Sequence, residues 1–192
     1  MENDIGKYLS ETPSIDYGNP EIQKKVRELK SQFGDDGDYI KRSYMFVRDE
    51  IPHSWDIGAD VVSKNASEAL MNGTGICWAK SCLLAALLRA NGIPSGISYQ
   101  LLALGADESE GHMIHALNTV YFNGKWIRLD ARGNTGDAID EFDLGEDHIA
   151  FHAQSELGEI DYHDNNADLD EGLANILAES KSLFDIPLDF RF

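Results

Sequence analysis

The sequence has few cysteines and no long apolar run. Its 192 residues include only 2 cysteines, Cys77 and Cys82. They stand five positions apart in one predicted helix and face different sides of it, which disfavours a disulfide between them. Without a disulfide framework, we expect a reducing compartment and a cytoplasmic protein. No apolar stretch approaches the roughly 18 residues that a membrane-spanning helix needs, so we expect no membrane partner.

Positive charge is also scarce. The chain has 16 Lys and Arg residues against 34 Asp and Glu residues, which gives a formal net charge of −18. Because nucleic acids and anionic membrane surfaces repel such a protein, neither is an expected partner. The charge is compatible with a neutral or cationic substrate. Hydrophobic residues make up 42% of the chain, which is enough for the core of one domain.

Hydrophobic periodicity divides the chain into a helical first part and a strand-rich second part. Apolar residues three or four apart predict amphipathic helices, and a Leu- and Ala-rich run predicts a further helix that stops at Asn91-Gly92. The expected helices span residues 20–33, 40–51, 67–71 and 78–90, and the expected strands span residues 96–104, 113–122 and 125–131. Helices followed by an antiparallel sheet define an α+β fold.

The two ends of the chain differ from this central part. Residues 1–18 mix Gly, Ser, Pro and acidic residues without periodicity, which predicts a loosely attached arm. Residues 19–134 carry the strong patterns and are expected to form the core domain. Residues 135–192 are acidic, with scattered aromatics, and are expected to be an extension that packs on the same domain. A final helix is predicted over residues 169–183.

Cys77 stands where a predicted helix begins. Two glycines and a threonine precede it, and the Ala- and Leu-rich run follows it. The unpaired N–H groups and the positive dipole end at such a position favour the thiolate, and the same N–H groups can hold an oxyanion. A cysteine is nevertheless most often a small buried hydrophobe, which is our interpretation of Cys82. The nucleophile hypothesis for Cys77 therefore requires a base elsewhere in the chain.

A predicted hairpin supplies a candidate base and its partner. Asn123-Gly124 between two strands predicts a two-residue turn, in which the numbers of paired residues sum to 247. His115 then stands opposite Arg132, with Asp130 as its diagonal neighbour on the same face, within reach of a hydrogen bond. Asp130 can orient the imidazole, and His115 can take a proton from Cys77. These three roles correspond to those of a Cys-His-Asp catalytic triad.

Histidine and aspartate also have common structural roles, in strands and in turns respectively. The co-occurrence of all three residues favours catalysis over these roles. Metal binding is disfavoured because His112 and His115 point to opposite faces of a strand. His148 and His152 have helical spacing but no evident third ligand, so we expect no metal and no other cofactor.

Two segments resemble the transglutaminase-like superfamily. Residues 75–94 resemble its nucleophile segment, and residues 115–130 resemble its histidine and aspartate segments in order and spacing. The resemblance covers roughly residues 39–134 and extends to bacterial proteins described as transglutaminase-like enzymes or candidate cysteine proteases. It implies a papain-like α+β core, with a cysteine at a helix start packed against an antiparallel sheet that carries the histidine and aspartate.

Carried over by position, the resemblance implies that Cys77 is the nucleophile, His115 the base and Asp130 its orienter. Papain-like folds take a second oxyanion donor from an upstream side chain, for which Trp55 and His53 are the candidates. The superfamily usually has an aromatic residue in its histidine motif at the position where Leu117 stands.

The expected function is cysteine-dependent acyl transfer on amide bonds through a thioester intermediate. Water as the second reactant makes the enzyme a protease or amidase, and an amine makes it a transglutaminase; the sequence leaves both open. The expected partners are a peptide or protein amide and, in the second case, a primary-amine acceptor. The alternative is a non-catalytic binding or scaffold domain of the same fold.

Overall fold

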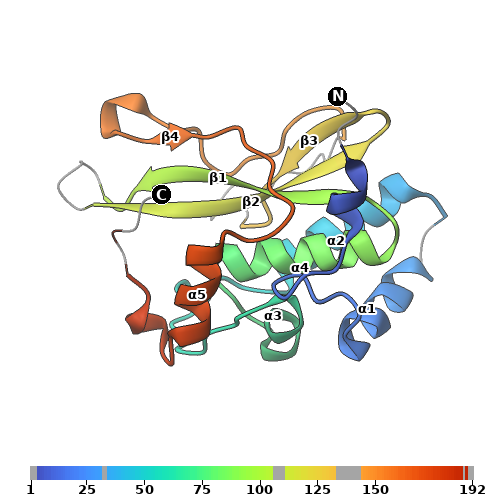
Figure 1. The fold of residues 1–192 in the computed structure, drawn as a ribbon, viewed down its shortest axis with the longest axis horizontal. Coiled ribbons are helices and arrows are strands. Elements are labelled where there is room, and N and C mark those ends of the chain that lie inside the picture. Colours follow the sequence, from blue (N-terminus) through green and yellow to red (C-terminus); the bar gives the residue numbers. More distant parts are fainter. Residues whose placement is uncertain (1–3, 32–33, 106–110, 133–143, 188, 190–192) are drawn as a thin grey trace.

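The computed structural model describes residues 4–31, 34–105, 111–132, 144–187 and 189. Helices cover one face of a four-stranded antiparallel sheet of order β3-β2-β1-β4, which confirms the expected α+β fold (Figure 1). The helices are α1 (Pro20–Lys30), α2 (Asp36–Asp49), α3 (Ala66–Asn72), α4 (Cys77–Ala90) and α5 (Glu171–Glu179). The strands are β1 (Ser95–Ala103), β2 (His112–Phe122), β3 (Lys125–Leu129) and β4 (Ile160–Asp161). Within the described residues, no helix is long and apolar enough to cross a bilayer.

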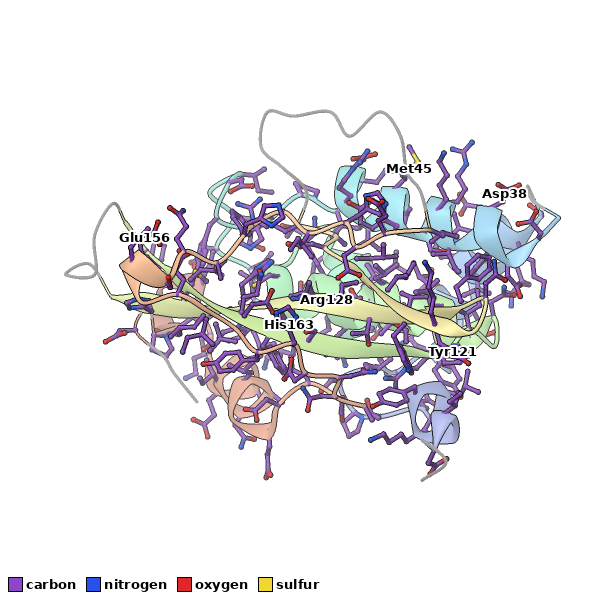
Figure 2. All side chains as sticks on the ribbon, turned by 90° about the horizontal axis from the view of Figure 1, so that it is seen from above. Asp38, Met45, Tyr121, Arg128, Glu156 and His163 are labelled. Atoms are coloured by element: carbon purple, nitrogen blue, oxygen red, sulfur yellow. The ribbon has the colours of Figure 1, made fainter. Side chains whose placement is uncertain are left out.

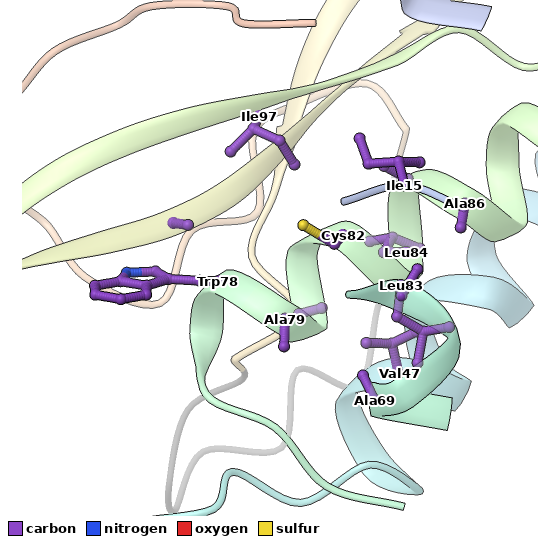
Figure 3. Packing of buried hydrophobic residues seen from close by; sticks show 14 of the residues in the cluster. Ile15, Val47, Ala69, Trp78, Ala79, Cys82, Leu83, Leu84, Ala86 and Ile97 are labelled. Carbon is purple, nitrogen blue, oxygen red and sulfur yellow. The ribbon is translucent and has the colours of Figure 1, made fainter. Parts of the chain in front are cut away.

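Helix α4 lies at the centre of the core. All its residues from Cys77 to Arg89 are buried, because the sheet covers one side of α4 and the other helices cover the rest. This position explains why Leu and Ala occur all round the helix instead of along one stripe. Cys82 is fully buried, and Figure 3 shows it in this core below Ile97 of β1. Burial raises the pKa of the Cys82 thiol, as expected for a structural cysteine.

Strands β2 and β3 form the predicted hairpin. Asn123 and Gly124 have φ angles of 49° and 84°, the left-handed conformation that this two-residue turn requires at both positions. Phe122 pairs with Lys125, so the predicted register is confirmed at the turn. The turn therefore determines which residues of the two strands share a face.

Strand β3 is shorter than the sequence predicted. Its ladder with β2 ends at Leu129, so the expected pairing of His115 with Arg132 is wrong. The backbone N–H of Asp130 donates to the carbonyl of His148, and the N–H of His148 donates to the carbonyl of Arg128, both at 2.8 Å. A segment from the acidic C-terminal part thus pairs with the edge of β3 that faces away from β2.

Residues 4–18 pack against the core, which differs from the loose attachment expected for residues 1–18. Ile15 is fully buried. The buried guanidinium of Arg89, at the end of α4, donates to the carbonyls of Ser10 at 2.7 Å and Ala167 at 2.6 Å. Each of these contacts is made by an isolated residue, so the sequence contains no periodic pattern that predicts them.

The described part of the C-terminal extension, residues 144–187, packs on the same domain. Strand β4 adds to the edge of the sheet beside β1, and α5 buries Leu173 against the core. Between them the chain follows the edge of β1, where Ile97 and Asn166 form an antiparallel bridge. Figure 2 shows His163 of this segment close to Arg128, with 3.2 Å between Nδ1 and Nη1. The expected boundary at residue 134 lies outside the described residues.

Gly96 lies where the segment that contains Asn165 and Asn166 meets β1. A Cβ atom at this position would lie 2.1 Å from Asn165 Oδ1 and 2.8 Å from the carbonyl oxygen of Asn166. We expect Gly96→Ala to displace the segment and to lower the free energy of unfolding by about 1–3 kcal/mol, as other overpacking changes do. Thermal unfolding measures the effect. Gly34→Ala is the matched control because no atom lies within 4 Å of its added Cβ, and equal losses in both variants would contradict the prediction.

Candidate active site

Cys77 is the first residue of α4. Ile76 precedes it in an extended conformation and its side chain cannot cap the helix, so the first turn has no side-chain hydrogen bond at its N-cap. Gly73 ends α3 with a φ of 66°, which a residue without a Cβ adopts readily. The chain thereby turns from α3 into α4 within a few residues. The cysteine is only 2% exposed.

The loop after α2 brings a second group to Cys77. The hydroxyl of Thr74 donates to the carbonyl of Pro52 at 2.8 Å, and His53 forms a parallel bridge with Gly75. These contacts hold the two loops side by side. The backbone N–H of Cys77 donates to Nε2 of His53 at 3.1 Å, so His53 lies directly beside the candidate nucleophile.

The sheet supplies the other two predicted site residues. His115 on β2 and Asp130 just after β3 are joined by a hydrogen bond of 2.7 Å between Nε2 and Oδ2. They are 3% and 1% exposed. The Asp130 carboxylate also accepts hydrogen bonds from the backbone N–H groups of Arg132 at 2.9 Å and Ala150 at 3.2 Å. The predicted diagonal neighbours are therefore in contact, with the carboxylate held by three donors.

The three side chains shift one another's pKa values. Burial by itself raises the pKa of the Cys77 thiol, but hydrogen bonds and charge interactions with His115 and His53 lower it to about 6. Burial by itself lowers the pKa of His115, but Asp130 and Cys77 raise it to about 10. Between these two values the site holds a thiolate beside an imidazolium. The same interactions keep the pKa of Asp130 below its ordinary value against the effect of burial.

A cavity of about 180 Å³ opens onto these groups. Its lining comes from the α2–α3 loop, the start of α4, the ends of β1 and β2, and the C-terminal extension: His53, Trp55, Cys77, Leu102, Ala103, Met113, His115, Arg132, Phe151 and Glu159. Both candidate oxyanion donors thus line the cavity, with their rings 5.5 Å apart. Leu117, at the position that departs from the superfamily pattern, is fully buried in β2.

The histidines of this region do not gather into a metal site among the described residues. Within the described part of the chain, no three His, Cys, Asp or Glu side chains are placed to hold a metal ion. His112 lies in the same strand as His115, and its Nε2 is 2.8 Å from the carbonyl oxygen of Leu157. That contact accounts for His112 structurally.

The part of the chain that matches a known protein family contains most of the elements just described. Residues 23–131 match the model of the transglutaminase-like superfamily, which is more than half of the chain. The chain belongs to this superfamily. The resemblance seen in the sequence is therefore confirmed. A search of curated proteins found no match.

Solved structures of other proteins share the transglutaminase-like fold. A candidate cysteine protease from Cytophaga hutchinsonii is 19% identical, with a TM-score of 0.54 over 68% of this chain and 43% of that protein. A candidate protease from Parabacteroides distasonis is 15% identical, with a TM-score of 0.43 over 65% of this chain and 25% of that protein. A protein named as a TGase is 18% identical, with a TM-score of 0.44 over 65% of this chain and 33% of that protein. The chain thus spans less than half the length of each of these three proteins.

Three residues near the triad were missed in the sequence. Phe151 and Glu159 come from the C-terminal extension, and the ring of Phe151 meets the ring of His115 edge-on at 5.2 Å. Neither residue belongs to a periodic segment. Lys80 lies one turn after Cys77, is 1% exposed, and its ammonium donates to the carbonyl of Ile51 in the loop that leads to His53. A cation near the start of the Ala- and Leu-rich helix was the available signal for Lys80.

Proposed function

We propose that this protein is a cysteine-dependent acyl-transfer enzyme acting on amide bonds, with Cys77, His115 and Asp130 as its triad. The observation that carries the proposal is the buried contact of a low-pKa thiol with a histidine that is hydrogen-bonded to a buried carboxylate. Perturbed pKa values that arise from such specific partners are characteristic of catalytic groups. Membership of the transglutaminase-like superfamily and the fold shared with a candidate cysteine protease support it.

The first half-reaction uses the thiolate and the imidazolium. The Cys77 sulfur attacks the amide carbonyl carbon, and the electron pair of the C=O bond moves to the oxygen. Collapse of this intermediate breaks the C–N bond, and His115 gives its proton to the departing amine. A thioester on Cys77 remains beside a neutral imidazole. Asp130 stays ionised and stabilises the charged form of His115.

In the second half-reaction, His115 takes a proton from water or from a primary amine as that nucleophile attacks the thioester. The C–S bond then breaks and restores the Cys77 thiolate. Water gives a carboxylic acid, and a primary amine gives a new amide. The proposed substrates are accordingly a peptide or protein amide and, for the second outcome, an amine acceptor.

We further propose that His53 supports the oxyanion together with the backbone N–H of Cys77. The two groups already contact each other at 3.1 Å, so a carbonyl oxygen that enters between them meets the Cys77 N–H and the imidazole edge. A protonated His53 presents Nε2–H as a donor, whereas the present contact uses Nε2 as an acceptor. The indole of Trp55 is the second candidate, from the same cavity.

A digest of casein in H₂¹⁸O with monodansylcadaverine tests the reaction. Hydrolysis introduces ¹⁸O into new carboxylates, and aminolysis attaches the fluorescent amine, so mass spectrometry distinguishes the two. We expect one of these products from the wild type and an at least thousandfold loss in Cys77→Ala, on the order seen for other nucleophile deletions. Cys82→Ala is the matched control. Equal product formation by Cys77→Ala, or none by the wild type across varied peptides, would favour the non-catalytic binding domain.

A further inference from the structure

One wall of the cavity beside Cys77 is formed by segments far apart in the sequence. Leu102 and Met113 come from the adjoining ends of β1 and β2, and Phe151 and Glu159 come from the C-terminal extension. Three of these four side chains are apolar. Glu159 therefore places one carboxylate in an otherwise apolar part of the lining.

The carboxylate of Glu159 is held in place by the backbone. The N–H of Ala103 donates to Oε1 at 3.0 Å, and the N–H of Gln154 donates to Oε2 at 2.7 Å. Both donors are neutral, and among the described residues the carboxylate forms no ion pair. The other charged residue outside the triad, Arg132, is bonded through its guanidinium to both carboxylate oxygens of Asp56, at 2.6 and 2.8 Å. The negative charge of Glu159 is thus left for a ligand.

The shape and polarity of this wall match one kind of side chain. A lysine has an apolar stem of four carbons and a terminal ammonium, and such side chains bury the stem along apolar surface while the charge finds a polar partner. A cavity of about 180 Å³ suits one side chain rather than a whole ligand, since ligand pockets usually measure about 300–1,000 Å³. The net charge of −18 also attracts cations to the protein.

We propose that Glu159 is a specificity-determining residue that selects a substrate side chain with a terminal ammonium, of the lysine type. The stem lies against Leu102, Met113 and Phe151, and the ammonium meets Glu159. This inference rests on the proposed function, because it makes the cavity the place where an amide substrate is recognised. The competing interpretation is that Glu159 only closes the turn between residues 154 and 159.

Three matched alkylating reagents test the proposal. Each is an iodoacetamide whose nitrogen carries a five-carbon chain that ends in an ammonium, a methyl or a carboxylate. The second-order rate of Cys77 modification is measured for each at pH 7 by peptide mass spectrometry. We expect the wild type to react about fivefold faster with the ammonium reagent than with the methyl reagent, and more slowly with the carboxylate; the factor is modest because solvent reaches the site.

Glu159→Gln should bring the ammonium-to-methyl ratio close to one, and Glu159→Lys should invert the preference. Glu156→Gln, in the same segment but outside the cavity lining, is the matched control and should keep the wild-type ratio. Loss of folding would also bring the ratio toward one, so the inverted preference of Glu159→Lys distinguishes charge recognition from unfolding. No charge preference in the wild type, or equal changes of all three rates in Glu159→Gln, would overturn the proposal.

If Cys77 is not a catalytic nucleophile, the same reagents give a different result. In that case the methyl reagent reacts with Cys77 no faster than with an ordinary buried thiol, and His115→Ala leaves its rate unchanged. A charge preference that persists under those conditions would support the Glu159 subsite as a binding site without catalysis. A His115-dependent rate without charge preference would support the triad and overturn the subsite.

Discussion

Replacing His115 with alanine should move the midpoint of Cys77 alkylation from about pH 6 to pH 9 or above. In the wild type, burial raises the pKa of the thiol, but the hydrogen bonds and charges of His115 and His53 lower it to about 6. Without the imidazolium at position 115, the largest lowering contribution is lost and burial prevails. Rates of iodoacetamide modification between pH 5 and 10, read by peptide mass spectrometry, give both midpoints.

The expected size of the effect follows from two opposing factors. At pH 6 the wild-type thiol is about half ionised, so a shift of about three pKa units lowers the thiolate fraction about 500-fold. A thiolate of higher pKa is intrinsically more nucleophilic, and a Brønsted coefficient of about 0.5 returns about 30-fold. We therefore expect modification about 15-fold slower in His115→Ala at pH 6. At pH 9 and above, the variant should react faster than the wild type.

The crossing of the two rate profiles is the sharpest feature of this experiment. Cys82 is the internal control. Burial raises the pKa of its thiol, and no histidine is among the groups that shift this pKa. Its modification should stay slow in both proteins unless they unfold. Parallel profiles for wild type and variant, both rising only near pH 8.5, would show that Cys77 and His115 do not form an ion pair.

Asp130→Asn should lower catalytic activity by about 10³- to 10⁴-fold and should also destabilise the fold. Both carboxylate oxygens accept hydrogen bonds, Oδ1 from Arg132 and Oδ2 from His115 and Ala150. Whichever way the amide turns, its nitrogen meets one of these N–H donors. The buried imidazolium also loses its counter-charge, a type of change that costs about 3–5 kcal/mol of stability. The activity loss has the size found when the orienting aspartate of a triad is replaced.

Chemical denaturation over a range of pH measures the stability part of this prediction. The folded-state pKa of Asp130 lies below its ordinary value, so its contribution is present above the ordinary carboxyl pKa and is lost as the pH falls through the folded value. The difference between wild type and Asp130→Asn should therefore shrink on acidification. The matched control is Asp56→Asn, since the Asp56–Arg132 pair is partly exposed and should contribute about 1 kcal/mol or less. Equal effects of the two substitutions would contradict the role assigned to Asp130.

The proposed charge selection by Glu159 and the proposed acyl transfer by the triad depend on different parts of the chain. The triad residues belong to α4 and to the β2–β3 hairpin, whereas Glu159 and Phe151 belong to the C-terminal extension. The extension also reaches the triad itself, because Ala150 donates to Asp130 and Phe151 packs edge-on against His115. Changes at Glu159 should therefore alter substrate choice, whereas changes at Ala150 or Phe151 should also affect the proposed chemistry.

Local patterns in the sequence were sufficient for the main parts of the site. The Ala- and Leu-rich run after two glycines predicted a helix over residues 78–90 that begins close to Cys77, since helix propensity and the stop at Asn91-Gly92 act over a few residues. Asn123-Gly124 determined the hairpin register, and strict alternation along a strand then placed His115 and Asp130 together.

The tertiary structure decided what no local pattern contains. The hairpin ladder ends at Leu129, and His148, from a distant segment, accepts the Asp130 N–H on the other edge of β3, which a two-strand register cannot anticipate. Lys80 and Glu159 have their positions because loops without periodicity pack against α4 and β1. Such contacts depend on the path of the whole chain and on burial in a shared core, so only the folded molecule reveals which side chains surround Cys77.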